Sequence, residues 1–313
     1  MTKTTAAMPI KPFSVEDVLK QLQQGHGLDL SRYQYGSAKH IGDYAVRQKV
    51  NHRKFVLDAL MDWSDREAVG IGAKIYGCTS RTPCNSPYCP MCRHRQQQTL
   101  ADDIQKAFGA VDDQQLFFMT TLVSVHYDPT ELTPDRVRAA KKAFRNRIAV
   151  KSQTDDRYKG VRWIGAFEID AKYGSEVLSV NQQNALTPLG FVEGEGRPFY
   201  LFHFHAVVDL AGIDAKEFRA ALTERLYPHP YQIKLQGLRS DKSKADNLRD
   251  LATYMLKFRL QHSDNVRASD DQQADEFKRT QYLSLYRPDI TRTVVKAVHC
   301  MGRFQGMTFK SVG

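Results

Sequence analysis

Residues 199–210 read FYLFHFHAVVDL, and this stretch decides the fold. Its aromatic and β-branched side chains are typical of a buried strand. His203 and His205 are two residues apart, so on a strand both imidazoles project from one face, while Phe202 and Phe204 project from the other. Two imidazoles on one face can bind one divalent ion, although two histidines on a solvated strand face would give the same pattern.

The segments on either side of this strand predict an α+β fold. Further strand candidates are residues 115–125 (QLFFMTTLVSV), 161–169 (VRWIGAFEI) and 231–238. Helices are expected at residues 134–151, 215–226 and 245–260. Two successive strand–helix–strand halves predict an antiparallel or mixed central sheet with helices on one face.

A carboxylate on a neighbouring strand can complete a metal site. Glu168 is embedded among apolar Ile164, Phe167 and Ile169, where an unpaired charge is costly. Two imidazoles and one carboxylate suit a divalent ion such as Mn²⁺ or Mg²⁺ and leave positions open for substrate oxygens. Asp170 is the alternative third ligand, and a salt bridge at the sheet edge is the alternative role of Glu168.

Four of the five cysteines lie close together in a segment rich in proline and glycine, with the spacing Cys78-x5-Cys84-x4-Cys89-x2-Cys92. A cysteine pair two residues apart is typical of a zinc knuckle, because the turn brings two sulfurs to one ion. The cluster predicts structural Zn²⁺, since four thiolates leave no position for water. His94 is a possible substitute ligand, and four reduced thiols without metal are the alternative.

The expected helix at 245–260 presents an acid, a phenol and an amine together. Asp250, Tyr254 and Lys257 fall within a narrow arc, opposite a core face made of Leu248, Leu251, Met255 and Phe258. An ordinary solvated helix face is the alternative. A tyrosine hydroxyl is a weak nucleophile at neutral pH, but a metal that polarises a phosphate and a nearby lysine lower the barrier to its attack. The carboxylate can then activate a second nucleophile.

The order of these motifs resembles that of the replication initiators of small rolling-circle plasmids, which belong to the superfamily of single-strand endonucleases with a His-hydrophobe-His metal motif. The resemblance covers roughly residues 78–260. It rests on Tyr88-Cys89-Pro90-Met91-Cys92-Arg93, then His203-Phe204-His205, then Tyr254-Met255-Leu256-Lys257. It implies a ferredoxin-like or RRM-like nuclease core, in which the strand near residues 116–122 is the first motif.

The resemblance also implies roles for single residues. His203, His205 and Glu168 would hold the divalent metal, Tyr254 would be the nucleophile, and Lys257 would help to hold the scissile phosphate. One branch of the family carries a glutamate four residues before the tyrosine, and here that position is Asp250, with a shorter side chain. The family often has a His-Pro pair where this chain has Leu201-Phe202.

The implied activity is site- and strand-specific nicking of a single-stranded or hairpin origin. Tyr254 would attack a phosphodiester, leaving a 5′-phosphotyrosine and a free 3′-OH that primes the host polymerase, and covalent retention would preserve the bond energy for strand closure. The implied partners are DNA, a host helicase and a host DNA polymerase.

Composition agrees with a nucleic-acid partner. The 313 residues include 45 Lys and Arg against 35 Asp and Glu, a formal net charge of +10. The expected helix at 134–151 carries Arg138, Lys141, Lys142 and Arg145 on one face, which could track a DNA backbone, although a solvated charged face is the alternative. No apolar run reaches the length of a membrane span or a signal peptide, so we expect a cytoplasmic protein with no membrane partner.

Changes in composition along the chain predict four parts. These are a helical accessory region at 1–72, which includes an expected helix at 15–24, a zinc-binding segment at 73–110, an endonuclease domain at 111–262, and an acidic linker with a basic C-terminal segment at 263–313.

Other functions share some of these features. A transposase would use the same chemistry, whereas a relaxase would place its tyrosine before the histidines. A zinc-dependent DNA-binding regulator would bind without cutting, and an iron-dependent oxygenase would also use two histidines and a carboxylate. The pairs Tyr282/Tyr286 and Tyr227/Tyr231 mimic two-tyrosine members of the superfamily, but the second pair contains two prolines and cannot occupy one helix.

Overall fold

A computed structural model describes residues 52–173, 180–193, 197–258 and 287–311, together with residues 20, 24 and 25. The expected helix at 15–24 and the acidic linker lie largely outside these residues. The helices and strands with bounds are α3 (Arg66–Tyr76), α4 (Pro90–Phe108), β1 (Leu116–His126), α5 (Pro134–Lys151), β2 (Arg162–Tyr173), α6 (Val180–Leu186), β3 (Pro198–Asp209), α7 (Ala215–Thr223), β4 (Ile233–Gly237), α8 (Lys244–Met255), α10 (Pro288–Cys300), α11 (Arg303–Met307) and β5 (Thr308–Lys310).

The centre of the molecule is a five-stranded sheet in the order β4-β1-β3-β2-β5, and every pairing in it is antiparallel. The four expected strands and the three expected helices of the two halves all form. The prediction of an α+β fold is therefore confirmed, and the sheet is antiparallel rather than mixed.

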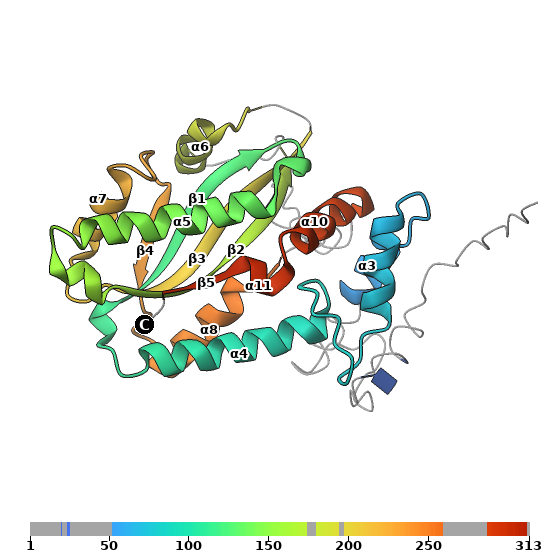
Figure 1. Ribbon diagram of the computed structural model, residues 1–313, viewed down its shortest axis with the longest axis horizontal. Helices are drawn as coiled ribbons and strands as arrows, with labels where there is room; N and C mark the ends of the chain where they lie inside the picture. Colours follow the sequence, from blue (N-terminus) through green and yellow to red (C-terminus); the bar gives the residue numbers. More distant parts are fainter. Residues whose placement is uncertain are drawn as a thin grey trace, which may run out of the picture.

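One face of the sheet is apolar and is covered by α5 and α7 (Figure 1). Phe204 of β3 lies 5.7 Å, between ring centroids, from Phe144 of α5 and 5.2 Å from Phe167 of β2. Arg147 of α5 donates from Nε to the carbonyl of Ala221 in α7 at 2.5 Å, which holds the two helices together. Aromatic packing on this face supplies a large share of the buried apolar area of the core.

The other face of the sheet carries the histidines and has its own helices, α8 and α4. Tyr254 of α8 contacts His205 on this face, and α8 packs along α4. The prediction of helices on one face only is therefore wrong. Residues 90–110 are not part of a separate cysteine segment, because α4 packs against α8 beside the sheet.

The C-terminal segment belongs to the sheet rather than to a separate unit. β5 pairs with β2, and Phe309 packs 5.1 Å from Phe167 and 5.2 Å from Phe204. Gly165 makes room for this strand, because a Cβ there would lie 2.8 Å from the Phe309 ring and 2.5 Å from the carbonyl oxygen of His205. The boundary expected at 262/263 does not separate residues 287–311 from the core.

The described part of the accessory region also packs onto the rest of the chain. Residues 52–60 are helical, and α3 lies next to α10. Arg292 pairs with Asp62 at 2.5 Å and Lys296 with Asp65 at 2.7 Å. The expected boundary at 72/73 is therefore not a break in packing.

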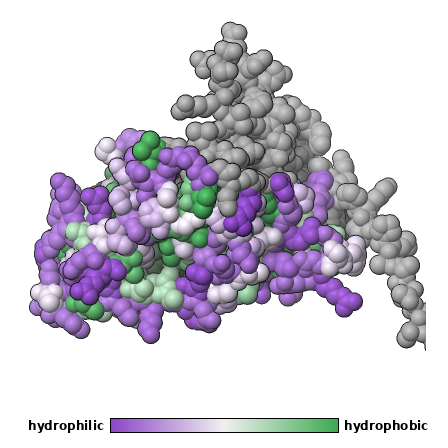
Figure 2. All heavy atoms as spheres, turned by 90° about the horizontal axis from the view of Figure 1, so that it is seen from above, coloured by the Kyte–Doolittle hydropathy of each residue, from purple (hydrophilic) through white to green (hydrophobic). Residues whose placement is uncertain are grey.

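The surface seen in Figure 2 is mostly hydrophilic, with hydrophobic residues gathered in smaller patches. Among the residues described, no helix combines the length and the apolar character that crossing a membrane requires.

A partly buried histidine makes the fold acid-sensitive. His299 of α10 shares a hydrogen bond of 2.8 Å with Ser86 in the cysteine segment. Burial, together with the charges of Arg303 and Lys74, lowers the pKa of His299 from 6.5 to about 4. Because only the unfolded chain binds this proton between those values, stability is full above pH 6.5 and falls as the pH drops to 4.

Acidification lowers the free energy of unfolding of the parent protein. We expect this drop to be smaller in His299→Gln by up to about 3 kcal/mol. Urea unfolding at pH 7.5 and at pH 4.5 measures it, with His229→Gln as the control on a partly exposed loop. An equal loss of stability on acidification in the parent and in His299→Gln would contradict the assignment.

Candidate functional site

The pairing of β2 with β3 creates a cluster of two histidines and one carboxylate. Glu168 lies directly opposite His203, and Ala166 lies opposite His205. Directly paired residues project to the same face, so the Glu168 carboxylate meets both imidazoles. All three side chains are buried, at 3%, 4% and 3% exposure for Glu168, His203 and His205.

The geometry of this cluster, called the triad below, fits metal binding. The Glu168 Oε2 atom lies 3.5 Å from Nε2 of His203 and 3.6 Å from Nε2 of His205. The other ring nitrogens have partners: Nδ1 of His205 lies 2.9 Å from the Thr120 hydroxyl, and Nδ1 of His203 lies 3.3 Å from the Leu201 carbonyl. Outer partners of this kind orient histidine ligands in metal sites. One donor atom from each triad residue lies within 4.8 Å of the others.

The electrostatics of the triad favour the ligand form of the carboxylate. Burial raises the pKa of Glu168, but its hydrogen bonds to His203 and His205 outweigh burial and hold that pKa well below its usual range. Burial and the charge of His203 lower the pKa of His205, which favours the neutral imidazole that a metal needs. Burial also lowers the pKa of His203, but the charges of Asp170 and Glu168 raise it more.

Asp170 stands at the rim of the triad. Its Oδ2 atom lies 3.9 Å from Nε2 of His203, and its side chain is partly exposed. The structure therefore brings Glu168 closer than Asp170 to both imidazoles, and Asp170 is outside the group of atoms that could share one ion.

Tyr254 lies beside the triad. Its ring centroid is 5.0 Å from that of His205 and 5.5 Å from that of Phe118, with edge-on geometry in both cases. The residue is 39% exposed, so part of it is accessible from solvent. Tyr254 thus faces the sheet rather than pointing away from the core side of α8.

Lys257 lies beyond the helix on which the spacing placed it, whereas Asp250 lies on α8 as predicted. α8 ends at Met255, and Phe258 has a left-handed φ of 42°, so Lys257 lies beyond the helix. Its Nζ nevertheless lies 2.9 Å from the centroid of the Tyr254 ring. Asp250 is exposed and pairs with Lys242 at 2.5 Å, and it is not part of the triad. On the predicted core face, Leu248, Met255 and Phe258 are buried, and Leu251 is half-buried and packs against the core.

The other tyrosines are placed differently. Tyr227 is buried beside Phe204, on the face opposite the triad, with a centroid separation of 6.3 Å. Tyr231 is exposed on the connection between α7 and β4. Tyr282 and Tyr286 lie outside the described residues.

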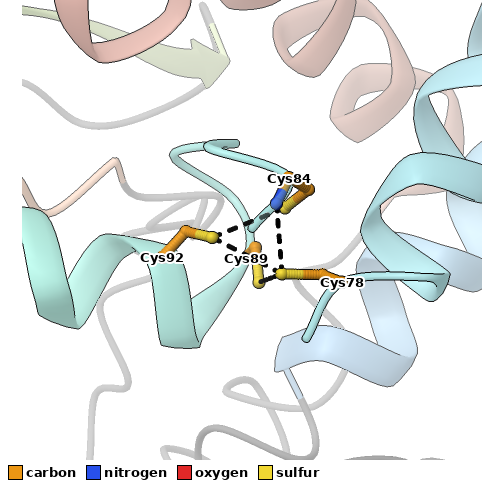
Figure 3. Close-up of side chains that lie close together, drawn as sticks. All are labelled: Cys78, Cys84, Cys89 and Cys92. Carbon is orange, nitrogen blue, oxygen red and sulfur yellow. Dashed lines mark hydrogen bonds between the residues drawn. The ribbon is translucent and has the colours of Figure 1, made fainter. Parts of the chain in front are cut away.

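The four predicted cysteines converge on one point, as Figure 3 shows. The Sγ atom of Cys92 lies 3.5 Å from that of Cys78 and 3.7 Å from that of Cys84, and the Cys89 and Cys78 sulfurs are 3.8 Å apart. Sulfurs bound to one tetrahedral zinc ion are about 3.8 Å apart. His94 is exposed and lies outside this group.

The surroundings of the sulfurs favour thiolates at Cys78 and Cys89, whereas hydrogen bonds within the cluster raise the pKa of Cys84 and of Cys92. Backbone N–H groups donate to Sγ of Cys78 from Cys84 at 3.3 Å and to Sγ of Cys84 from Ser86 at 3.5 Å. The Arg53 guanidinium donates to Sγ of Cys89 at 3.6 Å. Hydrogen bonds from the other three cysteines and the Arg53 charge hold the pKa of Cys89 well below its usual value. The donor set and spacing fit structural Zn²⁺.

The cysteine cluster is connected to the tyrosine through α4. Cys89 is the residue before α4, and Cys92 lies in its first turn. From the next turns, Arg93 donates from Nη1 to the Lys257 carbonyl at 2.7 Å, and Gln97 donates from Nε2 to the Thr253 and Leu256 carbonyls at 3.0 and 3.2 Å. These bonds satisfy carbonyls that the end of α8 leaves without helical partners.

Tyr88 extends the same connection into the core. Its ring lies 6.0 Å, edge-on, from that of Phe258, and its buried hydroxyl has no hydrogen-bond partner among the described residues. Burial, and then the charges of Glu168 and Asp170, raise the pKa of Tyr88 well above its usual value. The side chain between the two clusters therefore stays neutral.

The cations of α5 do not lie near the triad, because α5 covers the opposite face of the sheet. Lys141 donates from Nζ to the carbonyls of Gly306 and Thr308, at 2.5 and 2.6 Å, so it anchors the C-terminal segment. Burial and the charge of Arg145 lower the pKa of Lys141 to about 8. Arg138 pairs with Asp135, while Lys142 and Arg145 are exposed. The interpretation of all four as one DNA-tracking face is wrong for Lys141.

Several residues of the site carry no signal in the sequence. Thr120 orients His205, and Arg93 and Gln97 hold the end of α8. Thr120 lies on the strand that the family resemblance names as the first motif, which is the one available hint. Gln97 lies 156 residues before the carbonyl of Thr253 that it bonds, so no local pattern indicates it.

Comparison of the chain with protein-family models, with curated proteins and with solved structures gives no match.

Replacement of a cluster ligand tests the zinc site. We expect wild-type protein to contain about one zinc ion per chain and Cys89→Ser to lose most of it, because three thiolates bind more weakly than four. Elemental analysis measures the metal, and Cys300→Ser, at an exposed cysteine outside the cluster, is the control. Full zinc content in Cys89→Ser would argue against the cluster.

Replacement of the triad carboxylate tests the second site. We expect Glu168→Gln to weaken Mn²⁺ binding about tenfold or more, since the amide keeps the shape but loses the charge. Titration of Mn²⁺ by electron paramagnetic resonance measures the affinity, and Asp170→Asn is the matched control. If Asp170→Asn loses more affinity than Glu168→Gln, the third ligand is Asp170.

Proposed function

We propose that this protein is a metal-dependent endonuclease that cuts one DNA strand by forming a covalent bond between Tyr254 and the DNA. The observation that carries the proposal is the placement of the Tyr254 ring 5.0 Å from His205, beside a buried group of two imidazoles and a carboxylate. The side chains come from three different elements, so their meeting is a property of the fold.

The chain order supports the proposal. The elements β1, α5, β2, β3, α7 and β4 form two strand–helix–strand halves with sheet order 4-1-3-2, an order that supports the proposal of a ferredoxin-like core. The resemblance to rolling-circle initiators implies this core. In the proposed assignment, β3 carries the His-hydrophobe-His motif and β5 is an addition at the sheet edge.

The residues of the chain define the chemical step. A Mn²⁺ or Mg²⁺ ion held by His203, His205 and Glu168 would polarise the scissile phosphate when bound. The Tyr254 oxygen attacks phosphorus, the bond from phosphorus to the 3′ oxygen breaks, and a 5′-phosphotyrosine and a 3′-OH result. Overall, the proton of the tyrosine hydroxyl is transferred to the departing 3′ oxygen. The attack turns a phosphodiester into another phosphodiester, so strand closure can follow by the reverse step.

Two charged groups beside Tyr254 fit this step. The Lys257 ammonium against the ring stabilises a developing phenolate and balances the charge of the phosphate. In this proposal Asp250, one turn before Tyr254 on α8, is the general base for the second nucleophile once its pair with Lys242 opens.

The proposed biological role is initiation of rolling-circle replication of a plasmid in the cytoplasm. The free 3′-OH would prime a host DNA polymerase, and a host helicase would separate the strands. A transposase that uses the same tyrosine chemistry is the alternative within this class.

The tyrosine variant tests the reaction directly. We expect wild-type protein with Mn²⁺ to attach covalently to single-stranded DNA that carries the origin and a label at its 3′ end. Tyr254→Phe should lose this attachment by a factor of about 1000 or more, because the nucleophile is gone while the ring contacts with His205 and Phe118 remain. Denaturing electrophoresis separates protein-linked label from free DNA.

Tyr282→Phe and Tyr286→Phe are the controls, and each should keep wild-type attachment. Protein-linked label that persists in Tyr254→Phe but disappears in Tyr286→Phe would identify Tyr286 as the nucleophile in place of Tyr254. Binding of DNA without cleavage by the wild-type protein, with every divalent metal, would indicate a regulator rather than a nuclease.

A further inference from the structure

A cavity of about 870 Å³ lies at the β4 edge of the sheet and reaches its triad face, and no residue of α8 lines it. Its floor includes Leu122 of β1 and Leu201 of β3. Leu122 pairs with His203 in the sheet register, and Leu201 precedes His203 by two residues on the same face. Residues two apart on a strand are separated by about 7 Å, so the cavity adjoins the metal site.

The charged groups at the cavity are cations on either side of β1 and β3. Lys172 of β2 lines one side, and Lys234 of β4 and Arg219 of α7 line the other. Lys234 pairs in register with Thr120, the residue that orients His205. None of the described lining residues is an aspartate or a glutamate, and within the described chain Arg219 and Lys234 form no ion pair.

An exposed aromatic ring stands at the same rim. Tyr231 lines the cavity, is 57% exposed and has a left-handed φ of 61°. A bulky residue rarely adopts this conformation without a compensating constraint, and such strain gathers at binding sites. Cations combined with an exposed aromatic side chain are the usual means of holding single-stranded nucleic acid, by contact with phosphates and by stacking on bases.

We propose that this cavity binds the single-stranded DNA on one side of the scissile phosphate, with Arg219 and Lys234 on its phosphates and Tyr231 stacked on a base. The inference rests on the proposed function, since it places the substrate of that reaction. The volume suits a segment of nucleotide size, because ligand cavities in proteins run from about 300 to 1,000 Å³. The cavity extends from Leu201, two residues before His203, to the β4 edge of the sheet, whereas the exposed cations of α5 lie on the far face.

The test measures DNA binding apart from cutting. Full-length Tyr254→Phe protein is the background, and the probe is fluorescein-labelled oligodeoxythymidine followed by anisotropy at several salt concentrations. We expect Arg219→Ala and Lys234→Ala each to weaken binding and to lower the slope of log affinity against log salt by about 0.7, the value for one lost phosphate contact on a single strand. Tyr231→Ala should weaken binding roughly tenfold at every salt concentration, because stacking is not ionic.

Lys216→Ala on α7 is the matched control for Arg219→Ala, since it removes an exposed cation of the same helix that does not line the cavity. Affinity and salt slope that are unchanged in the three cavity variants, or reduced as much by Lys216→Ala, would overturn the proposal. Equal affinity for oligouridine would count against DNA as the occupant.

The same variants separate this inference from the proposed function. With Tyr254 restored, cavity variants that nick origin DNA with unchanged KM would overturn the cavity site and leave the nuclease intact. The opposite result is also informative. If the wild-type protein never nicks DNA but the cavity variants selectively lose DNA binding, the cavity site is supported and the proposed nuclease activity is overturned.

Discussion

The register between β2 and β3 is the constraint on which the rest of the site depends. It places Glu168 opposite His203, so that a buried carboxylate has two imidazoles within 3.6 Å. A slip of one residue would turn Glu168 to the apolar face and put Phe167 among the histidines. The cost of burying an unpaired charge and the loss of aromatic packing against Phe204 both oppose that slip. The fold and the site are therefore held by the same pairing.

One face of the sheet carries apolar packing, and the other carries the polar groups of the triad. Phe144, Phe167, Phe204 and Phe309 pack together on one face and supply the stable platform. The other face has the triad between α8, which carries Tyr254, and the cavity near α6. A rigid apolar layer behind the strands keeps the side chains in front of them in a fixed geometry, which a metal site requires.

The cysteine cluster and the triad are two separate groups of side chains, but the structure links them. The cluster determines where α4 begins, α4 holds the last carbonyls of α8 through Arg93 and Gln97, and α8 carries Tyr254. The position of Tyr254 thus depends on hydrogen bonds from Arg93 and Gln97, which follow Cys92 on α4. A metal held by the four cysteines would therefore act on the triad side of the molecule by positioning a helix.

The sequence by itself determined the α+β class, the four main strands, the ligand types of both clusters and the candidate nucleophile, because these depend on period-two patterning, on local spacing and on residue chemistry. It did not show that β5 joins the sheet, that helices cover both faces, that α8 stops before Lys257, or that Lys141 binds backbone carbonyls. Those features arise from contacts between residues far apart in the chain, such as Phe309 with Phe167 and Gln97 with Thr253. Only the folded chain decides them, since a contact across 150 residues leaves no periodic trace in the local sequence.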